Sequence, residues 1–140
     1  MALFFEFLAQ EWMLATALLV VLAMLFFHES RKAGPSLTPQ QAINLVNAEA
    51  GIFVDLRDKA DYKAGHIVDA VHIPSSKLLN NDTVELEKYR ERPIVLVCKL
   101  GQNAGAVSKK LRAAGFDKVY KMGGGMTEWS NQQLPVVGKG

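Results

Sequence analysis

One long apolar segment near the N-terminus most constrains what this chain can fold into. Sixteen consecutive residues, Trp12–Phe27, carry no charge, and Thr16 is the one polar residue among them. As a helix this segment would reach roughly 24 Å, a little less than the ~30 Å hydrocarbon core of a bilayer. Extending the helix back to Leu8 brings it to spanning length, so a single membrane anchor is the first expectation.

A cleaved secretory signal and a buried core helix are the two alternatives for this segment. A secretory signal opens with basic residues, whereas the first positive residue here is Arg31 and no clear cleavage site follows the apolar run. A core helix carries an apolar stripe on one face rather than apolar residues all round. The sequence therefore predicts one transmembrane helix over residues 8–28, a linker over 29–36 and one domain over 37–140.

The charges that flank the apolar segment predict its orientation. Glu6 and Glu11 precede it, and Arg31 and Lys32 follow it. Positive residues stay on the cytoplasmic side, so we expect a single-pass protein of the inner (cytoplasmic) membrane whose C-terminal domain faces the cytoplasm. A lone cysteine cannot form an internal disulfide, which agrees with a reducing compartment. The net charge is only +2 and no basic stripe is interleaved with aromatic residues, so no nucleic-acid partner is expected.

The rest of the chain alternates short apolar runs with helical patterns. Thr38 and Gln41 form a capping box at the start of a helix that Gly51 ends. Strands are expected at 52–57, 70–73, 93–98 and 118–122, and later helices at 86–89, 104–114 and 126–132. Strands that alternate with helices predict an α/β domain with a mainly parallel central sheet flanked by helices.

Cys98 ends the most apolar of these strands. Ligands of parallel α/β sheets bind beyond the carboxyl ends of strands. The turn from Lys99 to Asn103 can direct backbone N–H groups at an anion, and the helix that begins near Ala104 adds its positive dipole end. This pattern suits a nucleophilic thiolate that holds a second sulfur as a persulfide. The alternative is a packing cysteine, because free cysteine is among the most buried residue types.

Three segments, in order, resemble signatures of the rhodanese-like domains. The stretch VDLRDKADYKAGHIVDAVHIP resembles the N-terminal signature of that family. CKLGQNA resembles the active-site loop Cys-x-x-Gly-x-Arg-Ser/Ala, and LRAAGFDKVYKMGGGMTEWSNQQLPVV resembles the C-terminal signature. The resemblance covers roughly residues 37–138. With the added N-terminal helix, the chain is similar to the membrane-anchored, single-domain branch found in bacteria.

The resemblance implies a sulfur carrier. The family's cysteine accepts sulfane sulfur and passes it to a nucleophile, so Cys98 would be the catalytic residue. The resemblance also implies a small sulfur-containing donor or a protein persulfide donor. Neither a cofactor nor a metal is expected, because one cysteine and scattered histidines supply no zinc ligand set. The backbone N–H groups that would form the substrate or anion cradle belong to Lys99, Leu100, Gly101, Gln102, Asn103 and Ala104.

Two positions depart from the family pattern. Asn103 stands where the family usually has Arg, which would supply a permanent charge and a fork of donors for thiosulfate. The loss of one charge-assisted hydrogen bond is worth roughly 1.5–3 kcal/mol, so we expect weak thiosulfate sulfurtransferase activity. Asp69 replaces the Gly that usually precedes Ala70. The related phosphatases use a longer Cys-x5-Arg loop, which this chain lacks, so phosphatase chemistry is not expected.

Other polar residues are expected to support the site. Asp55 and Arg57 could bind substrate, but an internal ion pair that ties loops together is the preferred interpretation. His66, within Gly-His-Ile, is interpreted as a structural hydrogen-bonding residue rather than a catalytic base. The glycines of 123–125 most simply allow a tight turn beside the cysteine loop.

Two functions remain open from the sequence. The first is a membrane-anchored rhodanese-like sulfur carrier or sulfurtransferase. The second is a non-enzymatic rhodanese-fold interaction module that the anchor places beside another membrane protein. Asn103 and the membrane anchor both favour the module, whereas a cysteine kept at the strand end favours the carrier. A thiol oxidoreductase would need an external thiol, since the chain has no resolving cysteine.

Overall fold

The structure, a computed structural model, describes residues 1–32 and 34–138 of the chain. Ala33, in the expected linker, and the last two residues of the expected domain lie outside the described residues. The chain divides into two compact units, Met1–Lys32 and Ala33–Gly140.

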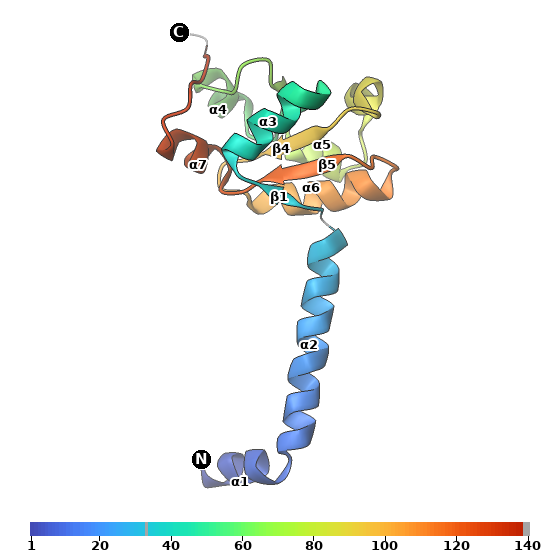
Figure 1. Ribbon diagram of the computed structural model, residues 1–140, viewed down its shortest axis with the longest axis vertical. Helices are drawn as coiled ribbons and strands as arrows, with labels where there is room; N and C mark the ends of the chain where they lie inside the picture. The colour runs from blue at the N-terminus through green and yellow to red at the C-terminus, as the bar shows by residue number, and fades with distance from the viewer. Residues whose placement is uncertain (33, 139–140) are drawn as a thin grey trace. The chain divides into compact units, whose positions relative to one another are not determined.

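The N-terminal unit consists of two helices, α1 (Ala2–Gln10) and α2 (Trp12–Lys32), as Figure 1 shows. No single helix among the described residues is long and apolar enough to cross a membrane, but the pair Ala2–Gln10 and Trp12–His28, bent by 83°, meets that test together. The expected continuous helix over 8–28 is therefore corrected, because the helix stops at Gln10 and a new one begins at Trp12. The bend occurs at Glu11, whose φ of −111° and ψ of 29° are not helical.

The expected linker over 29–36 is also shorter in the structure. α2 continues through Lys32, since the polar residues that follow the apolar run are compatible with a helix. At the other end, Ser36 and Leu37 form β1 (Ser36–Leu37), which pairs in parallel with Lys121 and Met122. The sequence did not indicate this strand, because two residues are too few to show a period of two.

The second unit is built on a five-stranded sheet in the order β1-β5-β4-β2-β3. Each of the four pairings between its strands is parallel, which confirms the expected α/β class. β4 lies at the centre, and all four of its residues are buried because both faces of the sheet are covered. The remaining strands are β2 (Ile52–Asp55), β3 (Val71–His72), β4 (Ile94–Val97) and β5 (Val119–Met122).

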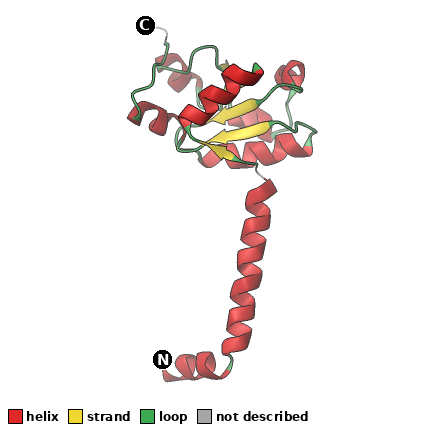
Figure 2. Cartoon of the chain, viewed as in Figure 1, coloured by secondary structure: helices red, strands yellow, loops and turns green. Residues whose placement is uncertain are grey.

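Helices cover both faces of this sheet (Figure 2). One face packs against α3 and α7, and the other packs against α5, α6 and the 3₁₀ helix η1. α3 begins with the predicted capping box, in which Thr38 and Gln41 exchange hydrogen bonds of 3.2 and 3.0 Å. The helices of this unit are α3 (Pro39–Glu49), α4 (Lys59–Ala64), α5 (Ser75–Leu79), η1 (Val84–Tyr89), α6 (Gln102–Ala113) and α7 (Gly125–Asn131).

The alternating direction of side chains along β4 determines the face of the sheet on which the Cys98 side chain packs. Successive side chains of a strand point to opposite faces. Val95 and Val97 pack in the cluster on the α3 and α7 face. Leu96 and Cys98 pack in the cluster on the α6 face. The period of two therefore places the thiol on the side of the sheet where α6 begins.

Candidate active site

Cys98 directly follows the central strand β4 and is only 3% exposed. It shares a buried cluster with Leu96 and with Val107 of α6. Because β4 pairs in parallel with β2 on one side and β5 on the other, the cysteine lies at the carboxyl edge of the sheet. This is the edge at which open α/β sheets bind their ligands. The predicted position of Cys98 at the end of the strand is confirmed.

The loop after Cys98 directs a backbone donor at the sulfur. The N–H of Gly101 donates a hydrogen bond to the Cys98 Sγ at 2.8 Å. Gly101 has a φ of +92°, a conformation that glycine adopts without the steric cost of a Cβ. α6 begins at the next residue, Gln102, so the positive end of a twelve-residue helix adjoins the loop. An amide donor and a helix N-terminus both stabilise negative charge on sulfur.

The start of α7 holds the backbone of the cysteine loop. The N–H of Met126 donates to the Cys98 carbonyl at 2.8 Å. Thr127 donates twice to the Lys99 carbonyl, from its N–H at 3.1 Å and from its Oγ1 at 3.0 Å. A Cβ on Gly125 would overlap the Cys98 carbonyl oxygen and lie 2.8 Å from the carbonyl carbon. The expected glycine turn therefore lies beside the cysteine loop, and Gly125 packs directly against the backbone of that loop.

The other residues of the expected cradle are divided between the surface and the core. Lys99, Leu100 and Asn103 are exposed, and Leu100 is a large apolar side chain that is 54% exposed. Ala104, by contrast, lies in the first turn of α6 and is fully buried. The N–H of Gly101 is hydrogen-bonded to the sulfur. The side chains of Lys99, Leu100 and Asn103 are therefore in contact with solvent, whereas the Cys98 side chain is buried.

A buried ion pair supports the neighbouring strand end. Arg57 Nη2 lies 2.7 Å from Asp55 Oδ2, and the two side chains are 11% and 2% exposed. Arg57 Nε also donates to Asp55 Oδ1 at 2.9 Å, and Nη2 donates to the Gly65 carbonyl at 2.6 Å. Asp55 is in register with Val97, the residue before the cysteine. The expected ion pair is present, and it ties the end of β2 to the segment after α4.

His66 makes its contacts within this same segment. Its Nδ1 lies 2.7 Å from the Tyr62 carbonyl oxygen, and its ring stacks on the Tyr62 ring with centroids 3.8 Å apart. The Tyr62 ring also stacks on His72 at 4.6 Å. The backbone of His66 pairs with Val137 through two hydrogen bonds of 2.7 and 2.8 Å. His66 therefore joins α4 to the C-terminal segment of the domain.

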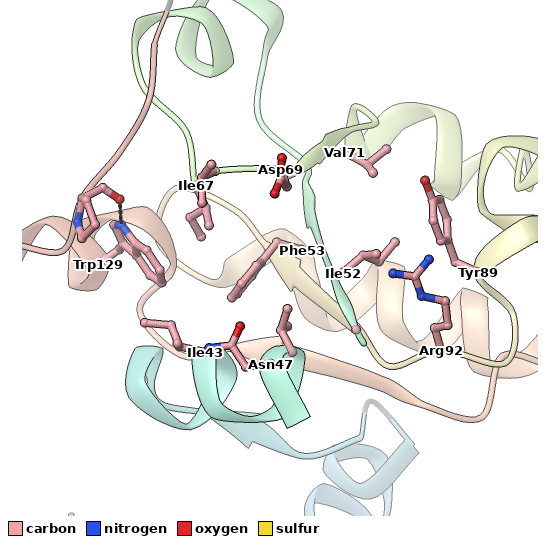
Figure 3. A pocket seen from close by; sticks show the side chains of 14 residues that line it. Ile43, Asn47, Ile52, Phe53, Ile67, Asp69, Val71, Tyr89, Arg92 and Trp129 are labelled. Atoms are coloured by element: carbon pink, nitrogen blue, oxygen red, sulfur yellow. Dashed lines mark hydrogen bonds between the residues drawn. The ribbon is translucent and has the colours of Figure 1, made fainter. Parts of the chain in front are cut away.

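A cavity of about 520 Å³ lies over the outer edge of β2 (Figure 3). Ile52 and Phe53 line it from opposite sides of the strand. β3 pairs only with the last two residues of β2, and the chain before β3 turns at Asp69, whose φ is +64°. The first half of β2 is thus left without a strand on that side among the described residues. No residue of 98–104 lines this cavity, so it is separate from the cysteine loop.

Two contributors to the site were not predicted. Met126 and Thr127 hold the loop from a helix 28 residues further along the chain. Their residue types give no signal, because two of the three bonds come from backbone N–H groups that every non-proline residue has. Within residues 1–32 and 34–138, no three His, Cys, Asp or Glu side chains gather closely enough to hold a metal ion.

Comparisons with known proteins agree with this geometry. The family model of the rhodanese-like domain matches residues 38–132. The uncharacterized protein YibN of Escherichia coli K12 is 31% identical over 121 residues, which cover 86% of this chain and 85% of that protein. A thiosulfate sulfurtransferase, GlpE of Pseudoalteromonas translucida, is 35% identical over 92 residues, or 64% of this chain and 82% of that enzyme.

Solved structures show the same fold. A rhodanese-related protein from Thermoplasma volcanium superposes with a TM-score of 0.65 at 23% identity, and covers 74% of this chain and 97% of its own. A rhodanese-like domain from Anabaena gives a TM-score of 0.64 at 25% identity, with 74% and 79% covered. Because the family match runs without interruption from α3 through the cysteine loop to α7, this chain belongs to the rhodanese-like domain family.

Proposed function

We propose that this protein is a membrane-anchored sulfur carrier in which Cys98 holds a persulfide. The observation that carries the proposal is the 2.8 Å hydrogen bond from the Gly101 N–H to the Cys98 sulfur at the carboxyl edge of the sheet. A cysteine that served only to fill the core would not need a backbone donor directed at it. The relatives named thiosulfate sulfurtransferase GlpE support the same chemistry.

The proposed reaction has two balanced steps. The Cys98 thiolate attacks the sulfane sulfur of a donor such as thiosulfate, a new S–S bond forms, and sulfite leaves with the electron pair of the broken S–S bond. A nucleophilic acceptor then attacks the outer sulfur of the persulfide, and the Cys98 thiolate leaves. The Gly101 N–H and the start of α6 would stabilise the negative charge that remains at Cys98 in both steps.

The first test is whether Cys98 accepts a sulfur atom. After incubation with thiosulfate, intact-mass spectrometry of the full chain in detergent is expected to show a species heavier by one sulfur atom. Peptide mapping should place that atom on Cys98, and cyanide should remove it. Cys98→Ser is the control and should gain nothing. A wild-type chain that takes up no sulfur from thiosulfate or from a protein persulfide would contradict the carrier function.

Asn103 is expected to limit the use of thiosulfate. It is exposed in the first turn of α6, so a longer side chain can be placed there without disturbing the core. Asn103→Arg should raise the rate of sulfur transfer from thiosulfate by about ten- to a hundredfold, since one charge-assisted hydrogen bond is worth roughly 1.5–3 kcal/mol. Asn103→Gln, which adds length without charge, is the matched control. An equal rate of sulfur transfer in Asn103→Arg and Asn103→Gln would show that the missing charge at position 103 is not the cause of weak thiosulfate activity.

The anchor is the second part of the proposal. The apolar run of α2, which passes the test for a membrane span only together with α1, and the basic residues after it support a single-pass inner-membrane protein whose domain faces the cytoplasm. The test is protease added outside spheroplasts, followed by immunoblotting against the C-terminus. The domain should survive in intact spheroplasts and be digested once they are lysed. Digestion in intact spheroplasts would show that the flanking charges were interpreted wrongly.

One observation favours a second function, an interaction module without catalysis. The exposed Asn103 has no charge where the family pattern has Arg, and Lys99 and Leu100 present their side chains to solvent beside it. The domain would then bind another membrane protein with this surface. Crosslinking from membranes separates the two functions. Partners that are captured equally by wild type and Cys98→Ser would favour the module, and partners lost in Cys98→Ser would favour the carrier.

A further inference from the structure

We propose that α1 is an interfacial helix, which lies in the membrane surface with its apolar side chains among the lipid acyl chains. The proposal rests on the membrane anchor proposed above and adds a second lipid contact to it. The axes of α1 and of Trp12–His28 differ by 83°. A helix that crosses a bilayer is tilted by about 20° on average, so α1 then runs close to parallel to the membrane surface.

The side chains of α1 are distributed as an interfacial helix requires. Glu6 and Gln10 are four residues apart and therefore share one narrow face. The large apolar residues occupy the remaining faces, and no residue of α1 is buried in the structure. Phe4, Phe5 and Phe7 are 59%, 63% and 56% exposed. The narrow polar face can therefore meet water and headgroups, while the aromatic and aliphatic side chains of the other faces enter the acyl region.

The length of α2 also calls for a second element. Its uncharged stretch, Trp12–Phe27, reaches roughly 24 Å, about 6 Å short of a ~30 Å hydrocarbon core. An interfacial helix buries its apolar face about 5–10 Å into the boundary between headgroups and acyl chains. α1 therefore fills the part of the outer leaflet that α2 does not reach. Trp12, at the junction, is of the residue type enriched at that depth.

The backbone at the bend favours an interface over the bilayer centre. The Glu11 N–H donates to the Phe7 carbonyl at 2.8 Å, and the Ala15 N–H donates to the Glu11 carbonyl at 3.0 Å. The residues between Glu11 and Ala15 open α2, and the first N–H groups of a helix have no acceptor within that helix. Unsatisfied backbone groups are not tolerated in hydrocarbon. Water and lipid headgroups can satisfy them, so the bend belongs at the level of the headgroups.

Depth measurements on the full chain test this arrangement. In a Cys98→Ser background, single cysteines are placed by Phe4→Cys, Glu6→Cys, Phe7→Cys and Leu22→Cys, and each is labelled with an environment-sensitive fluorophore. The proteins are reconstituted in vesicles of phosphatidylcholine and phosphatidylglycerol that carry quenchers at shallow or deep acyl positions. We expect the probes at Phe4 and Phe7 to be quenched equally, and by the shallow quencher more than by the deep one. The probe at Glu6, on the polar face, should be the least quenched of the three.

Each alternative gives a different pattern. A straight helix would put position 4 roughly 4.5 Å further out than position 7, so unequal quenching that falls toward the N-terminus would overturn the proposal. Equal exposure of positions 4, 6 and 7 to water would also overturn it. The Leu22 probe reports the anchor separately. Deep quenching at Leu22 with none on α1 refutes only the interfacial helix, whereas no quenching at Leu22 refutes the anchor itself and this proposal with it.

Discussion

Replacing Gly125 with alanine is expected to destabilise the domain by about 3 kcal/mol or more and to abolish sulfur uptake by Cys98. The new Cβ would overlap the Cys98 carbonyl oxygen and lie 2.9 Å from the Lys99 carbonyl carbon. Gly125 also has a φ of +56°. Overpacking a tight contact costs about 1–3 kcal/mol, and a left-handed conformation at a residue with a side chain adds about 1–3 kcal/mol. Both atoms in the way belong to the backbone, so no side chain can move aside.

Thermal unfolding of the full chain in detergent, followed by the fluorescence of the buried Trp129, is the measurement. Gly105→Ala is the matched control, since a Cβ there meets no atom within 4 Å and Gly105 lies inside α6. In a helix interior, Ala is favoured over Gly by roughly 0.5–1 kcal/mol. The control should therefore be neutral or slightly stabilised. Equal melting of Gly125→Ala and wild type would refute the tight contact between α7 and the cysteine loop.

Removing the Asp55 carboxylate is expected to cost about 3–5 kcal/mol of folding free energy. Breaking a buried ion pair by deleting one partner leaves the other charge without compensation. In Asp55→Ala the Arg57 guanidinium would keep only the Gly65 carbonyl as an acceptor among the contacts described above. The end of β2 would also lose its connection to the segment after α4. Urea unfolding of the full chain in detergent measures the loss.

Two controls test whether the loss of stability arises because the ion pair is buried, rather than because any ion pair is lost. The double variant Asp55→Leu with Arg57→Met should recover much of the lost stability, because apolar residues can replace a buried ion pair at little cost. Lys77 and Glu85 form a pair with the same 2.7 Å separation on the surface, where Lys77→Met should change stability little. A loss in Lys77→Met as large as that in Asp55→Ala would show that burial is not the cause.

The Glu85 carboxylate hydrogen-bonds Lys77 and raises the pKa of the Lys77 ammonium above its usual value of 10.5. Because the folded-state pKa is the higher one, the pair contributes its small stability fully at neutral pH. That contribution is lost as the pH rises through the folded-state pKa. Between pH 6 and about 9, the free energy of unfolding should therefore change with pH in the same way in wild type and in Lys77→Met. The two curves should differ only by a small constant amount.

The α/β class and the place of the cysteine could be predicted because both depend on short-range patterns. An apolar run such as PIVLV favours a buried strand, and the turn after it follows from Gly101. Three other short elements were not predicted. β1, α4 and α5 contain two, six and five residues, too few for a period to stand out. β1 forms because β5 supplies its hydrogen bonds. α4 and α5 make their own backbone hydrogen bonds, but helices this short depend on tertiary packing for their stability.

The N-terminal helices show the same division between local pattern and three-dimensional structure. Composition alone marks Trp12–Phe27 as a segment suited to lipid. It also suggested a helix that continues back to Leu8, because Leu8 and Ala9 are compatible with one. Only the backbone conformation at Glu11 decides that the helix ends and turns there. Glutamate is compatible with a helix, so the helix propensity of Glu11 does not show that α1 ends before it. The break is visible only in the three-dimensional structure.

The sequence by itself determined the parallel α/β domain, the thiol at a strand end and the apolar segment, since each arises from residues that are neighbours in the chain. The tertiary structure alone decided that Met126 and Thr127 hold the loop of a cysteine almost thirty residues earlier. It also decided the parallel pairing of Ser36 with Lys121. Such contacts depend on packing between segments that are distant in the chain. The helix and strand propensities of single residues do not indicate which distant segment will lie close once the apolar faces are buried together.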